Sequence, residues 1–196
     1  MPDTSWQNAL ARLRNGNARY QAFRQSHPRL DPEWRAELAA GQNPFAAVLG
    51  CADSRVPPEL IFDQGLGDLF VVRVAGNVLD ETVLGSLEFA VNRLEVPLVL
   101  VLGHEACGAV TAALGDSPPP GALGGLVARV SPALEGLALP GDGAEQVDVA
   151  ARANARHVAA ALRRALPAVA ATGHTRVLSA FYRLADGAVE FLEPAP

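Results

Sequence analysis

Residues 45–55 read FAAVLGCADSR: an unbroken apolar run, then a cysteine, and then two opposite charges separated by one residue. A short apolar run that ends in a loop is typical of a strand covered on both faces. Residues 69–74 and 97–102 form two further runs of this kind, and residues 81–94 between them have a helical pattern. Strands that alternate with helices predict an α/β fold with a central, mostly parallel sheet covered by helices.

The N-terminal 40 residues predict two helices. Residues 4–7 resemble a capping box, in which a hydroxyl and a glutamine satisfy free backbone amides. Asp31 followed by Pro32 predicts the start of a second helix, which Gly41 ends. An amphipathic first helix is indicated by the spacing of Trp6, Leu10, Leu13 and Tyr20.

The sequence pattern of the C-terminal half predicts a loop, a long helix and a hairpin. Residues 116–125 are rich in Pro and Gly and predict a loop, and residues 143–165, rich in Ala and Arg, predict a long helix. Residues 176–184 and 188–192 flank an Ala-Asp-Gly turn and predict an antiparallel pair of strands.

Composition limits the function. A length of 196 residues suits one domain over residues 1–196, and the net charge of −5 argues against a nucleic-acid partner. No stretch approaches the roughly 18 apolar residues of a membrane span, so we expect no membrane association. Residues 1–8 are polar and lack the apolar core of a signal peptide, so the expected location is the cytoplasm.

Three side chains with metal-binding chemistry come directly after two predicted strands. Cys51 follows the first run, and His104 and Cys107 follow the run at 97–102. Ligands in open α/β sheets bind where the carboxyl ends of the strands meet, so neighbouring strands would bring these residues into one crevice. Two thiolates and one imidazole suit Zn²⁺ and leave a fourth position open, as in a catalytic site. Asp53 is the candidate for reversible occupation of that position.

Simpler interpretations exist for each residue alone. A single buried cysteine is usually a small core residue, and Asp53 with Arg55 can be a plain ion pair. A redox dithiol is disfavoured because the cysteines are not in a Cys-x-x-Cys arrangement. A functional metal site is favoured because two cysteines, a histidine and an Asp/Arg pair all occur at strand ends.

The motif Cys51-x-Asp53-Ser54-Arg55, followed much later by His104-x-x-Cys107-Gly108, resembles the signature of the β-carbonic anhydrases. The similarity runs over most of the chain and is strongest over residues 41–111. One departure is Ala52, where the family usually has a small hydroxyl residue, in a position that is not a ligand.

The resemblance implies a sheet of four parallel strands extended by an antiparallel strand. It implies that Cys51, His104 and Cys107 bind zinc, and that Asp53 either ligates the metal or pairs with Arg55. Gln42 and Phe70 match positions that line the carbon dioxide pocket in the plant-like branch. It further implies a homodimer or homotetramer, in which residues 1–40 form an arm that packs on a second subunit.

The expected activity is the zinc-dependent, reversible hydration of carbon dioxide to bicarbonate and a proton. Hydrolysis of carbon disulfide or carbonyl sulfide with the same metal ligands is the rival activity, and an inactive zinc-binding relative is the non-enzymatic alternative. Retention of Asp53 and Arg55 argues against the latter. One branch of the family also binds bicarbonate at a non-catalytic site with a Trp, an Arg and a Tyr. Arg73 matches that arginine, but Val48 stands at the tryptophan position.

Overall fold

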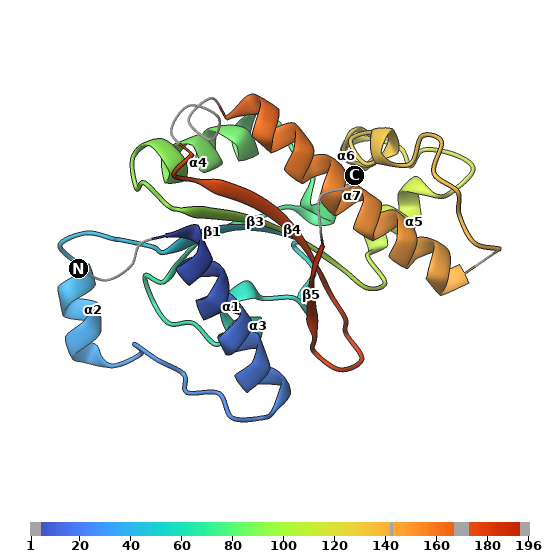
Figure 1. Ribbon diagram of the computed structural model, residues 1–196. Coiled ribbons are helices and arrows are strands. Elements are labelled where there is room, and N and C mark those ends of the chain that lie inside the picture. The colour runs from blue at the N-terminus through green and yellow to red at the C-terminus, as the bar shows by residue number, and fades with distance from the viewer. Residues whose placement is uncertain (1–4, 142, 167–172, 193–196) are drawn as a thin grey trace.

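A five-stranded sheet with helices on both faces forms the centre of the computed structural model, which describes residues 5–141, 143–166 and 173–192 (Figure 1). Spatial strand order is β2-β1-β3-β4-β5. The first four strands of this order are parallel and β5 pairs antiparallel with β4, which confirms the predicted sheet. The strands are β1 (Ala46–Gly50), β2 (Leu69–Arg73), β3 (Leu98–His104), β4 (Arg176–Tyr182) and β5 (Val189–Leu192).

Helices α1 (Trp6–Gln21) and α3 (Pro58–Ile61) lie on one face of the sheet, and α4 (Glu81–Asn92) and α7 (Gly143–Ala165) lie on the other (Figure 1). The chain leaves β1 towards β2 on one side and leaves β3 towards β4 on the other. The gap between the carboxyl ends of β1 and β3 is therefore the topological switch point, where such sheets bind ligands. The remaining helical elements are α2 (Pro32–Leu38), α5 (Gly108–Ala113), α6 (Ala122–Val127) and the 3₁₀ turns η1 (Ala75–Asn77) and η2 (Ser131–Ala133).

Several predicted boundaries were wrong. His104 is the last residue of β3, whereas the predicted strand ended at Leu102, because the His104 backbone still pairs with Tyr182 of β4. The predicted loop at 116–125 is too long, since α6 begins at Ala122. The N-cap of α1 is Ser5, whose hydroxyl accepts a hydrogen bond from the Asn8 amide at 3.2 Å. Thr4 of the predicted capping box lies outside the described residues.

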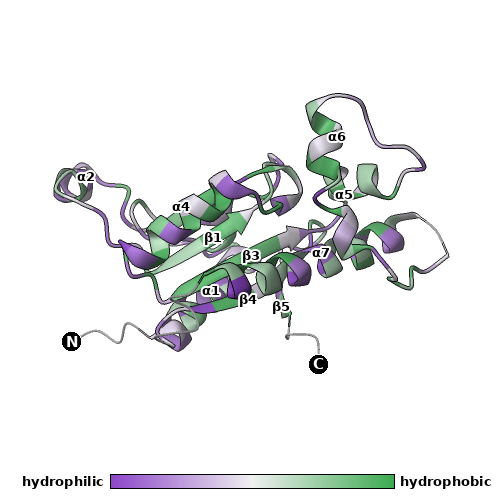
Figure 2. Cartoon of the chain, turned by 90° about the horizontal axis from the view of Figure 1, so that it is seen from above, coloured by the Kyte–Doolittle hydropathy of each residue, from purple (hydrophilic) through white to green (hydrophobic). Residues whose placement is uncertain are grey.

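The core is built on β1 and β3, whose residues are all buried. Figure 2 shows these strands as apolar ribbons between helices of mixed character. Helix α7 approaches β3 closely at Gly103, where an added Cβ would lie 3.1 Å from the Ala151 carbonyl oxygen. This close approach lets α7 lie directly over the strand that carries His104.

The N-terminal helices differ in how they pack on this chain. Helix α1 packs on its own sheet, with Leu13 fully buried, whereas α2 buries none of its residues. Packing of residues 1–40 on a second subunit concerns another chain and stays a prediction. None of the helices in the described residues combines the length and apolar character needed to cross a membrane.

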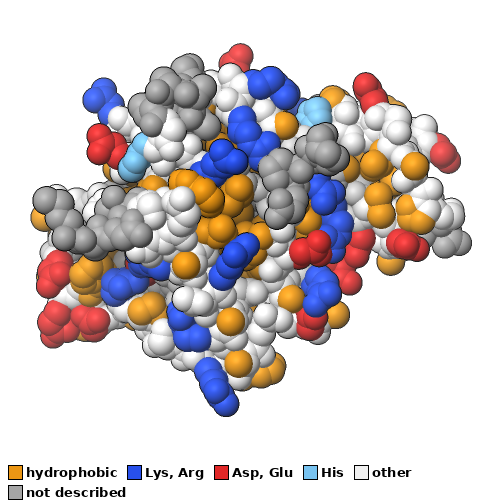
Figure 3. Space-filling view, in the orientation of Figure 1, with side chains coloured by type: hydrophobic (Ala, Val, Ile, Leu, Met, Phe, Trp, Pro, Cys, Tyr) orange, Lys and Arg blue, Asp and Glu red, His pale blue; other side chains and the backbone are white. Residues whose placement is uncertain are grey.

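Arginine side chains border an apolar area on the face drawn in Figure 3, near the centre of the view. In the matching orientation of Figure 1, β4 passes here between α1 and α7. The guanidinium of Arg14 lies 5.0 Å from the ring centroid of Phe191, and that of Arg176 lies 5.8 Å from that of Trp6. These cation–π contacts partly cover the aromatic rings at the end of the sheet.

Candidate metal centre

Cys51 comes immediately after β1 and is 4% exposed. Its Sγ accepts hydrogen bonds from two backbone amides, that of Gly76 at 3.2 Å and that of Asp53 at 3.5 Å. Backbone N–H groups aimed at a sulfur favour its thiolate form. The end of β1 thus presents a buried sulfur prepared to carry negative charge.

His104 ends β3, the strand beside β1, and is fully buried. Its Nδ1 lies 2.8 Å from the Glu105 carbonyl oxygen and donates to it, because a carbonyl can only accept. This assigns the remaining lone pair to Nε2, which is buried and has no hydrogen-bond partner in the described part of the chain. A buried imidazole nitrogen with a free lone pair, opposite an anchored N–H, is what a metal-binding histidine presents.

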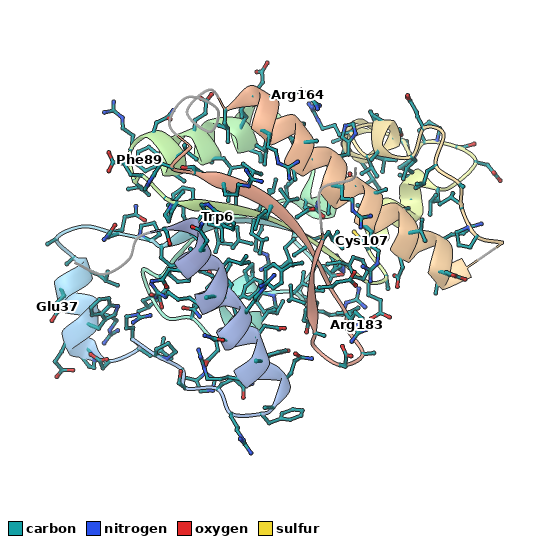
Figure 4. All side chains as sticks on the ribbon, in the orientation of Figure 1. Trp6, Glu37, Phe89, Cys107, Arg164 and Arg183 are labelled. Carbon is teal, nitrogen blue, oxygen red and sulfur yellow. The ribbon has the colours of Figure 1, made fainter. Side chains whose placement is uncertain are left out.

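Cys107 offers the third candidate ligand atom and is 1% exposed. It is the N-cap residue of α5, and the chain reaches it through Ala106, which has a positive φ of 52°. The Sγ atoms of Cys51 and Cys107 and a ring nitrogen of His104 all lie within 4.8 Å of one another. Figure 4 labels Cys107 close to α7, at the end of the sheet where β1 and β3 terminate. The three side chains that follow the ends of β1 and β3 therefore lie close together, as expected from the strand positions.

The two thiols act as a coupled pair. A hydrogen bond with Cys107 lowers the pKa of Cys51 to about 4, against the opposing effect of burial. The same hydrogen bond, together with burial, raises the pKa of Cys107. Metal binding at such a pair of thiols requires their deprotonation, so a divalent cation bound here would release protons. The soft donor set and the free Nε2 of His104 fit Zn²⁺, with three protein ligands.

Asp53 and Arg55 form a two-pronged ion pair beside the ligands. The Arg55 guanidinium donates to both carboxylate oxygens, at 2.9 and 2.7 Å, and the Arg55 amide donates to Oδ1 at 2.9 Å. Hydrogen bonding from Arg55 holds the pKa of Asp53 well below its usual range. Arg55 also donates to the Ala106 carbonyl at 3.3 Å, which ties the pair to the loop between His104 and Cys107.

Arg73, the last residue of β2, holds the backbone around Cys51. Its Nε donates to the Cys51 carbonyl at 2.9 Å and its Nη2 donates to the Asp53 carbonyl at 2.5 Å. These bonds hold the backbone of both Cys51 and Asp53. The sequence indicated Arg73 only through its position in a bicarbonate site, so this backbone contact was not predicted.

Gln42 and Phe70 are not brought to the ligands within one chain. Gln42 is exposed and precedes β1, whereas Cys51 follows the strand at its other end. Phe70 pairs with Ala47 near the start of β1, and its ring packs against Phe89 with centroids 6.1 Å apart. Their predicted role in substrate binding therefore requires something beyond a single chain.

Two acidic residues near the ligands were missed by the sequence analysis. Glu105 accepts hydrogen bonds from the Leu184 amide at 2.6 Å and the Ala185 amide at 3.2 Å, which anchors the His104 loop to the β4–β5 turn. Burial raises the pKa of Asp148, on α7, whose environment includes Glu105 and Ala106. Only the three-dimensional fold brings these partners together, so no local sequence pattern indicates them.

Comparisons with known proteins agree with this geometry. Residues 46–189 match the protein-family model described as carbonic anhydrase. The chain is 45% identical over 194 residues to carbonic anhydrase 2 of Mycobacterium tuberculosis strain H37Rv, covering 95% of this chain and 93% of that protein. It is 43% identical over 197 residues to the carbonic anhydrase of Mycolicibacterium smegmatis, covering 97% and 95%.

A solved structure gives the same result for the fold. The match is to one of two tetrameric β-carbonic anhydrases from the ascomycete Sordaria macrospora, with a TM-score of 0.74 and 28% identity. It covers 95% of this chain and 96% of that one. Sequence, fold and the converging Cys51, His104 and Cys107 lead to one conclusion: this chain belongs to the β class of the carbonic anhydrase family of enzymes.

Proposed function

We propose that this protein catalyses the zinc-dependent, reversible hydration of carbon dioxide to bicarbonate and a proton. The observation that carries the proposal is that a ring nitrogen of His104 and two cysteine sulfurs lie within 4.8 Å of one another, while the buried His104 Nε2 has no hydrogen-bond partner among the described residues. Cys51, His104 and Cys107 would hold the metal. Zn²⁺ held there would supply the Lewis acidity that makes water a nucleophile near neutral pH.

Asp53 would orient the attacking water. An ionised carboxylate offers about four lone-pair positions, and Oδ1 accepts two hydrogen bonds while Oδ2 accepts one from the Arg55 side chain. Oδ2 therefore keeps capacity to accept another hydrogen bond, from water or from bicarbonate. Arg55 and Arg73 fix the carboxylate and the backbone behind it, so that this acceptor is already oriented before substrate arrives.

Gln42 and Phe70 would serve the site of a second copy of this chain. The strand β2 is the edge of the sheet, is only half-buried and lies near Phe89, which is 47% exposed. A two-fold axis beside such an edge and perpendicular to the strand would set the partner's β2 antiparallel to it. The amino end of one sheet would then adjoin the carboxyl end of the other, where the metal ligands lie. The proposed assembly is therefore a homodimer, or a homotetramer built from such dimers.

Complementation tests this shared site. Gln42→Ala and Cys107→Ala chains would each be poorly active alone. After co-refolding in equal amounts, a mixed dimer has one complete site, so roughly a quarter of the wild-type activity should return for random pairing. No recovery, with mixed dimers shown to form, would place Gln42 outside the partner's site.

The compartment proposed for this reaction is the cytoplasm. Both cysteines are free and buried in the described structure, and the metal centre needs them reduced. Reducing compartments keep thiols in that state.

Parallel assays distinguish the proposed activity from its rivals. Purified protein with measured zinc content should hydrate carbon dioxide far faster than it hydrolyses carbonyl sulfide or carbon disulfide. Preferred turnover of either sulfur compound would overturn the assignment of substrate, and zinc binding without any of these activities would indicate an inactive relative.

A further inference from the structure

The Gly76 amide is the closer of the two backbone donors to the Cys51 sulfur, at 3.2 Å. Gly76 belongs to the η1 turn and has a φ of 68°, a conformation that favours glycine. A Cβ added there would lie 3.0 Å from the Ala109 Cβ. The position of this N–H therefore depends on one tightly packed turn.

Asn154 fixes that turn from the opposite side. It lies on α7 and is fully buried, and its Nδ2 donates to the Gly76 carbonyl at 2.8 Å across 78 residues of sequence. Its Oδ1 is buried and has no hydrogen-bond partner within the described residues. A buried amide with one end unpaired costs free energy, whereas an apolar side chain of similar size would not. The Nδ2 contact is therefore the feature of Asn154 that an apolar residue could not replace.

We propose that Asn154 is a positioning residue of the metal centre, acting through Gly76 on Cys51. Holding the Gly76 carbonyl fixes the residue whose N–H points at the sulfur, and this hydrogen bond tunes how strongly the thiolate donates to a metal. Outer contacts of this kind typically change metal affinity by about 10–100-fold. The inference rests on the zinc centre proposed above.

Zinc affinity, measured by competition with a chromophoric chelator, tests this role. Asn154→Leu and Asn154→Ala lose the same donor but leave different packing, so both should raise the zinc Kd by about 10-fold despite unequal thermal stabilities. In the Co²⁺-substituted proteins, the sulfur-to-cobalt charge-transfer band should shift in both variants. Unchanged Kd and band in a folded variant would overturn the role, as would a Kd that follows thermal stability.

Asn17→Leu is the matched control. Asn17 is 4% exposed and its Nδ2 also donates to backbone carbonyls, those of Ile61 and Gly187, neither of which belongs to residues 51–55 or 104–108. This variant should lose stability and keep the wild-type zinc Kd. An equal rise in Kd would make the effect of Asn154 a general consequence of core damage and overturn the proposal.

A double-mutant cycle tests the path through Gly76. If Asn154 acts through this residue, Asn154→Ala should raise the Kd little further once Gly76→Ala has displaced the turn. Additive effects would overturn the proposed path. A wild-type protein that binds no zinc would overturn the metal centre and this inference together, whereas zinc binding that is insensitive to Asn154 overturns this inference alone.

Discussion

The Arg55 guanidinium donates to both carboxylate oxygens of Asp53, at 2.9 Å from Nε and 2.7 Å from Nη2. Arg55→Ala should therefore leave zinc bound and lower the hydration rate by about 100-fold, because the carboxylate loses its orientation. Zinc analysis and stopped-flow hydration measure the two effects. Arg183→Ala is the control, since Arg183 makes a similar two-pronged pair with Asp186 in the β4–β5 turn. Full activity of the Arg55 variant would show that the Asp53 pair is only structural.

Asp63 should make the fold sensitive to acid. Burial opposes its ionisation, but hydrogen bonds from the backbone and hydroxyl of Ser26, the Arg19 side chain and the His27 backbone lower its pKa from 3.8 to about 2. A lowered folded-state pKa contributes stability that is complete above 3.8 and is lost as pH falls through about 2.

Asp63→Asn should thus lower the free energy of unfolding by about 2 kcal/mol at neutral pH. It should also flatten the loss of stability between pH 4 and pH 2, measured by denaturant titration. Asp116→Asn, at an exposed loop position, is the control. A steep acid transition that persists in the Asp63 variant would assign that transition to other groups.

Activity should rise from neutral into alkaline pH. Two thiolates would offset the charge of Zn²⁺ more than neutral imidazoles would, so water at the proposed metal centre would ionise at a higher pH. The Arg55 contacts hold the pKa of Asp53 below its usual range, so this carboxylate is already ionised and its titration cannot cause the rise. The test is the hydration rate measured from neutral to alkaline pH. A rate that stays flat or falls as pH rises would contradict the expected increase.

Bicarbonate should inhibit without cooperativity. Val48 is fully buried in β1, paired with Val71 and Leu100, and provides no indole for a second bicarbonate site. Arg73 is already bonded to the Cys51 and Asp53 carbonyls. Inhibition of the hydration rate by increasing bicarbonate should follow a hyperbolic curve, and a sigmoidal one would indicate a regulatory site elsewhere.

The positions of the candidate metal ligands could be predicted from sequence, because each candidate is tied to a local pattern. The apolar run before Cys51 predicts a strand, and the strand end fixes where that side chain projects. The same holds for His104, although pairing with β4 extends its strand by two residues beyond the prediction, from Leu102 to His104. Both predictions, for Cys51 and for His104, depend on a short apolar run, which can be recognised in a single sequence.

The supporting contacts could not be predicted, because they join segments far apart in the chain. In the sequence, Asn154 is one polar residue of an Ala-rich helix, and nothing near it indicates its hydrogen bond to Gly76. Gln42 is the opposite case. Its match to the family is visible in sequence, but in the single chain it precedes β1, whereas Cys51 follows that strand at its other end. In the proposed dimer, the second chain would bring Gln42 to the candidate metal centre.

Stopped-flow carbon dioxide hydration before and after metal removal tests the zinc-dependent activity most directly. Wild-type protein should contain one zinc per chain, fall to the uncatalysed rate when a chelator strips the metal, and recover when Zn²⁺ is restored. Cys107→Ser should fail to recover, because it lacks one of the three ligands. Full activity of the stripped wild-type protein would contradict the proposed zinc-dependent mechanism.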